Sequence, residues 1–107
     1  MARASSGRPP AAVLLDLNSP EFQAQLFALD RTLLAQVVEV LDRLRRMAWS
    51  DVYRSPGLKW EKIGRVAPNG EPLYSLRMTQ KVRAVGYRNG LFLRLISLHP
   101  DHDSAYR

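Results

Sequence analysis

Two adjacent residues, Asn89 and Gly90, constrain the fold of this chain more than any other feature of its sequence. They separate two largely apolar runs, 82–88 and 91–98, each of a length typical of a β-strand. An Asn-Gly pair favours a type I′ turn, in which both central residues need positive φ angles. The sequence therefore predicts a β-hairpin at this point, and with it antiparallel pairing of the two strands.

Three further segments are predicted to be strands. Residues 12–17 are short and apolar, residues 58–63 lie between Gly57 and Gly64, and residues 73–78 alternate with a period of two. Pro-Asn-Gly at 68–70 is typical of a turn. Because the connections between the later strands are short, antiparallel pairing is expected among them.

The segment between the first two predicted strands contains two helix starts. Ser19 is suited to cap a helix that begins at Pro20, and Asp30 is suited to cap a second one. The second helix is expected to end before the Pro-Gly pair at 56–57. Trp49 and Tyr53, near its end, are expected to pack in the core rather than stack on a nucleobase. Its apolar stripe consists of Leu34, Val37, Leu41, Leu44 and Ala48, widened by Leu33, Val40 and Met47.

Together these elements predict an α+β fold, with two N-terminal helices packed on one face of a small twisted antiparallel sheet. A length of 107 residues fits a single domain, which we assign to 11–107. Residues 1–10 are rich in Ser, Gly, Pro and Arg and are predicted to be a disordered basic lead.

Basic side chains are concentrated in the strand-forming half of the chain. The net charge is +6, yet between residues 54 and 94 nine Lys or Arg residues face only two acids. A field of this kind attracts polyanions such as nucleic acids or acidic protein segments. The alternative is a solvated basic face without a binding role.

Composition also narrows the kind of protein. The absence of cysteine excludes disulfides and thiolate metal sites and is compatible with a reducing cytoplasm. No apolar run reaches the roughly 18 residues that a membrane span needs, and the N-terminus is a poor secretory signal. We therefore expect a cytoplasmic protein.

One tract within this basic half resembles a known family. Residues 74–83, YSLRMTQKVR, have the form aromatic-Ser-x-Arg-(x)5-Arg, and a His and Tyr-containing tail follows the last predicted strand. In this tract, in its order of elements and in its basic sheet, the chain resembles the RelE/ParE superfamily of toxins from bacterial toxin–antitoxin systems. The resemblance extends over nearly the whole of 13–106.

The resemblance implies a toxin whose partner is a cognate acidic antitoxin. RelE-type members are endoribonucleases that cleave mRNA at the ribosome and so inhibit translation, whereas ParE-type members inhibit DNA gyrase without RNA cleavage. A RelE-like endoribonuclease is the first hypothesis. A non-enzymatic toxin of the same fold, or an inactive antitoxin-binding member, is the alternative.

In RNA cleavage of this type the ribose 2′-OH attacks the adjacent phosphorus, and neither a metal nor a cofactor is expected. The resemblance implies that Arg83 stabilises the developing charge, with Arg77 as a second basic residue. His99 or His102 is the candidate for proton transfer, and Tyr106 for stacking on a base or positioning the phosphate. Further candidate contacts to RNA phosphates are Lys59, Lys81 and Arg88.

Structural roles are the alternative for several of these residues. Arg77 is a candidate ion-pair partner of Glu61 or Glu71. Arg88 and Arg94 are expected to be solvated or to face the antitoxin rather than to act in catalysis.

The polar tail allows a second chemistry. His99, Asp101, His102 and Asp103 include nitrogen and oxygen ligands for a metal, but the segment is short and no second ligand cluster exists elsewhere in the sequence. The two aspartates are expected to shape a turn, and their negative charge beside a phosphate site favours the non-enzymatic alternative.

Overall fold

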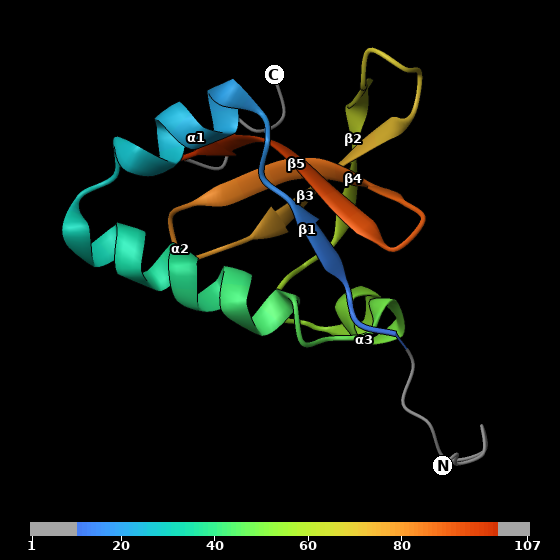
Figure 1. The fold of residues 1–107 in the computed structure, drawn as a ribbon, viewed down its shortest axis with the longest axis horizontal. Coiled ribbons are helices and arrows are strands. Elements are labelled where there is room, and N and C mark those ends of the chain that lie inside the picture. Colours follow the sequence, from blue (N-terminus) through green and yellow to red (C-terminus); the bar gives the residue numbers. More distant parts are fainter. Residues whose placement is uncertain (1–10, 101–107) are drawn as a thin grey trace.

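The structure is a computed structural model, and it describes residues 11–100. Within this range the chain forms an α+β fold in which three helices pack on a five-stranded, mostly antiparallel sheet (Figure 1). The elements are β1 (Leu14–Asp16), α1 (Pro20–Phe27), α2 (Arg31–Leu44), α3 (Trp49–Arg54), β2 (Glu61–Val66), β3 (Pro72–Arg77), β4 (Arg83–Asn89) and β5 (Phe92–His99).

The sheet has the strand order β1-β5-β4-β3-β2. The strands from β2 to β5 pair antiparallel, as predicted. The prediction of a wholly antiparallel sheet is wrong for β1, which lies parallel to β5 with Leu14 opposite Phe92. Parallel pairing is possible because a long connection, with three helices and the strands β2 to β4, separates β1 from β5 in the chain. An ion pair between Asp16 and Arg94 reinforces this edge.

The two predicted helix starts are confirmed. The Ser19 hydroxyl accepts a hydrogen bond from the backbone N–H of Phe22, with Pro20 at the first helical position. The same hydroxyl donates to the backbone oxygen of Ile96 at 3.0 Å, which fastens the start of α1 to β5. The Asp30 carboxylate caps α2 at its N-terminus.

The second helix ends earlier than predicted. It ends at Leu44, and Ala48 stands at the N-cap position of a separate helix, α3, instead of continuing the apolar stripe of α2. The physical reason is a competing partner, because the backbone oxygen of Met47 accepts a hydrogen bond from Val13 at 2.8 Å. The fold therefore has three helices in the described residues where two were predicted.

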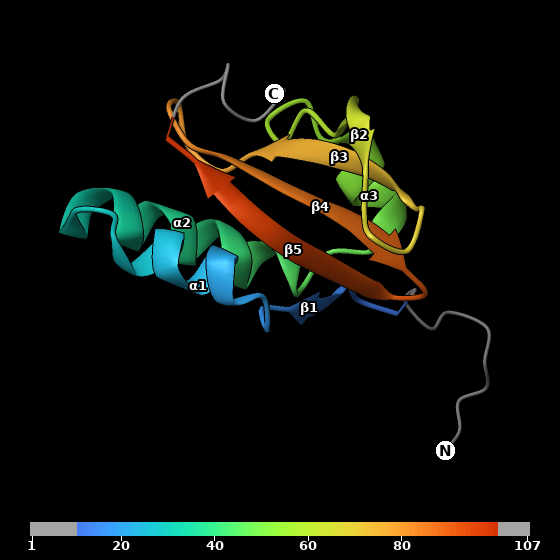
Figure 2. The same cartoon turned by 90° about the horizontal axis from the view of Figure 1, so that it is seen from above.

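The core lies between the helices and one face of the sheet. Figure 2 shows α1 and α2 together on one side of β4 and β5. Phe22, Val37 and Leu44 from these helices are buried against Leu95 and other strand residues. We call the opposite side of the sheet the open face; it carries a smaller cluster formed by Ile63, Ala67, Leu73 and Val85.

The remaining differences between the predicted and the observed elements lie in the turns and at the ends of strands. The strand predicted at 58–63 forms instead at 61–66, and Gly64 lies within it. In the β4–β5 hairpin Asn89 pairs with Phe92, so Gly90 and Leu91 form the loop. Of Asn89 and Gly90, only Gly90 has a positive φ. The predicted type I′ turn is therefore wrong, although the hairpin is present. No helix among the described residues is long and apolar enough to cross a bilayer.

Candidate functional site

Three of the predicted site residues lie side by side on the open face of the sheet. Arg77 on β3 pairs with Arg83 on β4, and Arg83 pairs in turn with His99 on β5. Directly paired residues of antiparallel strands point to the same face. The neighbouring pair, Ala84 and Leu98, is buried beneath the helices, so these three side chains point away from the helices. We call Arg77, Arg83 and His99 the polar row.

Arg83 is held within the sheet face rather than extended into solvent. Its side chain is only 5% exposed, and Nη2 donates to the hydroxyl of Ser75 at 3.3 Å. The same nitrogen lies 3.6 Å from Oε1 of Glu61, whose side chain is 47% exposed. Glu61 was a predicted candidate partner of Arg77, and it pairs with Arg83 instead. The hydroxyl orients the guanidinium, and the carboxylate partly neutralises it.

Arg83 and Arg77 both retain hydrogen-bonding capacity. Nε of each guanidinium is buried and has no hydrogen-bond partner. Among the residues that the structure describes, no carboxylate forms an ion pair with Arg77. Buried donors without acceptors are rare in proteins, and they are most easily satisfied by an anion or by water. Two such guanidiniums in adjacent register positions favour a ligand with several acceptor oxygens, such as a phosphate.

His99 completes the polar row at β5. Its ring nitrogen Nε2 lies 2.8 Å from the hydroxyl of Ser97, and the ring is half-buried. Which of the two atoms donates depends on the tautomer of the imidazole. The contact fixes the ring orientation, so the histidine is held next to Arg83 in the same cross-strand register.

The other predicted residues lie elsewhere. Lys81 is exposed in the turn between β3 and β4, and Lys59 is exposed before β2 with a φ of 48°. Arg88 is far from the polar row, near the opposite end of β4, where its guanidinium lies over the ring of Trp49. Trp49 is buried, as predicted, whereas Tyr53 is 49% exposed.

Part of the predicted site falls outside the described residues. This applies to His102 and Tyr106, and to the tail aspartates Asp101 and Asp103. Within 11–100 no group of three His, Asp or Glu side chains is placed to hold a metal ion.

Three residues support the polar row in a way that was not predicted from the sequence. Ser75 and Ser97 are buried polar residues, and Glu61 faces Arg83 across the sheet. The sequence contained a signal for both serines, because Ser75 lies between Tyr74 and Leu76 and Ser97 lies between Ile96 and Leu98. A small hydroxyl at such a position indicates a buried hydrogen bond.

Comparison with protein-family models, with curated proteins and with solved structures finds no match for this chain.

Proposed function

We propose that this chain is a RelE-like toxin, an endoribonuclease that cleaves mRNA and so inhibits translation. The observation that supports it best is the polar row, which puts Arg77, Arg83 and His99 on adjacent strands of one sheet face. Phosphoryl transfer needs positioned positive charge and a group that moves a proton. The polar row contains positive charge in its two arginines and a proton-transfer group in His99. It lies on the open face of the sheet, which no helix of the described residues covers.

The proposed reaction begins at the ribose 2′-OH. Its oxygen attacks the adjacent phosphorus, the bond from phosphorus to the 5′-oxygen breaks, and a 2′,3′-cyclic phosphate is left on the upstream fragment. His99 takes the proton of the 2′-OH, and the leaving 5′-oxygen takes a proton from water. Arg83 and Arg77 stabilise the extra negative charge on the phosphate oxygens, and the loss of one such donor typically slows catalysis by about 10²–10³-fold.

A phosphate must compete with Glu61 for Arg83. Because Glu61 is half-exposed and its ion pair with Arg83 is long at 3.6 Å, this ion pair is weak and a phosphate can compete with it for Arg83. Arg83 itself is buried and keeps its hydrogen bond to Ser75, so it meets the phosphate from within the sheet face.

The basic character of the strand-forming half also supports an acidic partner. In the proposal, a cognate antitoxin with an acidic segment neutralises this surface, and the protein acts in the cytoplasm. Antitoxin binding should weaken as salt rises, because exposed charge pairs are screened.

A non-enzymatic toxin of the same fold is the second candidate. It is favoured by the burial of Arg83, since an arginine held by Ser75 and Glu61 also serves as an internal cross-link of the sheet. In that case the surface binds an antitoxin or gyrase, and no RNA is cut.

Mapping RNA 5′ ends after brief induction of the protein separates the two candidates. The wild type should produce new ends in a reporter transcript, whereas Arg83→Met should lose at least about 99% of the cleavage. Arg43→Met, the same change on the exposed side of α2, is the matched control and should cleave normally. Circular dichroism of each purified variant establishes that it is folded.

Full cleavage by Arg83→Met would refute the role of the polar row. Growth arrest by the wild type without new RNA ends would refute the endoribonuclease and leave the second candidate. Blocking translation initiation on the reporter tests ribosome dependence, because cleavage at the ribosome then stops.

A further inference from the structure

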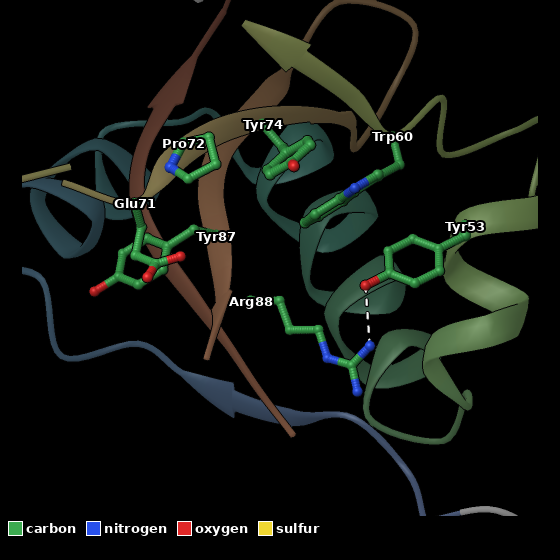
Figure 3. A pocket seen from close by; sticks show the side chains of 7 residues that line it. All are labelled: Tyr53, Trp60, Glu71, Pro72, Tyr74, Tyr87 and Arg88. Atoms are coloured by element: carbon green, nitrogen blue, oxygen red, sulfur yellow. Dashed lines mark hydrogen bonds between the residues drawn. The ribbon is translucent and has the colours of Figure 1, made fainter. Parts of the chain in front are cut away.

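A pocket of about 210 Å³ lies between α3 and the strands β3 and β4, distant from the polar row. Figure 3 shows its side chains around a common space, with Tyr53 and Trp60 on one side and Glu71 and Tyr87 on the other. We call it the aromatic pocket. Its volume is below the roughly 300–1,000 Å³ of pockets that take drug-sized ligands, so it suits one flat ring system.

The aromatic side chains of the pocket support each other. The rings of Trp60 and Tyr74 stack with centroids 4.7 Å apart and planes 15° from parallel. Tyr53 packs against Trp60 with centroids 6.0 Å apart. A stacked pair braced by a third ring loses little conformational entropy when a planar ligand packs on it.

Arg88 is held in place beside these rings. Its Nε donates to the backbone oxygen of Gly90 at 2.7 Å, and Nη1 donates to the hydroxyl of Tyr53 at 3.0 Å (Figure 3). The guanidinium also lies over Trp49, 4.8 Å from the ring centroid. Its third nitrogen, Nη2, makes no hydrogen bond within the described residues. A donor is therefore fixed in position and available to a ligand.

Glu71 provides the complementary charge. Its backbone is anchored, because its oxygen accepts from Ala67 N–H at 2.8 Å and its N–H donates to the Asn69 side chain at 3.1 Å. Its carboxylate forms no ion pair or hydrogen bond with any other described residue. Glu71 and Arg88 thus line the same pocket without meeting, although their charges are opposite.

We propose that the aromatic pocket binds a guanine base of single-stranded RNA. Guanine presents two adjacent donors, N1–H and the N2 amino group, which match the two oxygens of a carboxylate such as Glu71. It presents two acceptors, O6 and N7, which suit an arginine such as Arg88. Adenine has no comparable pair of adjacent donors on its edge. Recognition of unpaired bases by aromatic stacking and edge hydrogen bonds is the usual mode for single-stranded RNA.

The aromatic pocket is a separate site from the polar row. Arg83 and Arg88 are five residues apart on β4, a separation of about 17 Å along an extended strand. The inference rests on the proposed function only for the source of the guanine, which would be the RNA substrate. Base binding itself needs no cleavage and can be measured alone.

Fluorescence titration of the purified protein with guanosine monophosphate and adenosine monophosphate tests the pocket. Trp60 lines it and Trp49 lies next to it, and the chain has only these two tryptophans, so a stacked base should quench the emission. We expect saturable quenching, with the guanine nucleotide bound at least about tenfold more tightly.

Glu71→Gln should remove this preference, because its side chain has an NH2 donor in place of the second acceptor oxygen and cannot pair side by side with two adjacent donors. Adenosine monophosphate binding should change little. Glu39→Gln, on the exposed side of α2, removes the same charge elsewhere and should keep the preference.

Equal affinity for the two nucleotides would overturn the proposal, since the edge contacts would then contribute nothing. Failure of both nucleotides to bind would overturn it as well, and would leave the pocket to a protein side chain. Arg83→Met distinguishes this inference from the proposed function, because it should lose RNA cleavage and keep nucleotide binding. A wild type that binds the guanine nucleotide but cuts no RNA would refute the endoribonuclease alone.

Discussion

Glu61→Gln tests whether the carboxylate of Glu61 competes with phosphate for Arg83. The two side chains are 3.6 Å apart at their nearest charged atoms, and that of Glu61 is 47% exposed. An ion pair with so exposed a partner stabilises a fold by less than about 1 kcal/mol. The variant should therefore stay folded, with its Tm lowered by at most about 8 °C.

Although Glu61→Gln should be slightly less stable than the wild type, it should bind RNA more tightly. Removing this carboxylate leaves the positive charge of Arg83 without the acidic partner at 3.6 Å. Each phosphate neutralised on a single strand contributes about 0.7 to the slope of log K against log salt concentration. If Arg83 gains a full phosphate contact, the slope should steepen by up to about 0.7, and affinity at low salt should rise.

Fluorescence anisotropy of a labelled single-stranded oligonucleotide measures this effect. Methylation of its 2′-hydroxyls prevents the proposed attack, so binding is observed without cleavage. Glu39→Gln is again the matched control, since it removes one exposed carboxylate from α2. Equal changes in the two variants would indicate a general charge effect and would refute competition at Arg83. Weaker binding by Glu61→Gln would refute it too.

Three further predictions concern stability. Gly86→Ala should lower the free energy of unfolding by about 1–3 kcal/mol in a denaturant titration, because the new Cβ would lie 2.4 Å from a backbone oxygen of β5. Gly64→Ala is the control and should show no such clash, since no atom lies within 4 Å of its new Cβ. The pKa of Asp16 is lowered from 3.8, first by the hydrogen bond from the backbone N–H of Asn18 and further by the guanidinium of Arg94. The ionised Asp16 carboxylate therefore stabilises the folded state above pH 3.8, and this stabilisation is lost as pH falls through the lower folded pKa. The Tm difference between wild type and Asp16→Asn should then shrink in acid. Ser19→Ala should cost about 0.5–2 kcal/mol in the same titration, since the cap of α1 and its bond to β5 are both removed; an unchanged midpoint would contradict this.

Local chemistry made much of the fold predictable. The caps at Ser19 and Asp30 depend on the residues within one helical turn, so the sequence contains all that determines them. The strands β3, β4 and β5 agree with the predicted ranges to within one residue, because alternation and turn residues are also local signals. The end of α2 was missed because a distant residue, Val13, accounts for it.

The polar row was predictable in its residues and not in its geometry. Arg77, Arg83 and His99 were chosen by resemblance, whereas their common register depends on how three strands pair. That register includes a bulge next to Gly86, where β5 approaches closely, and no local pattern marked it. The pairing of Glu61 with Arg83 was missed for the same reason.

The parallel pairing of β1 with β5 has a consequence for when the protein becomes functional. The strand β5 lies between β1 and β4 in the sheet, yet it is the last of the five strands along the chain. During synthesis β1 therefore has no neighbour, and His99 is absent from the open face, until almost all the described residues have been made. Such contacts between distant parts of a chain form late in folding. In the proposed function, the polar row would stay incomplete until β5 has been made and has paired with β4.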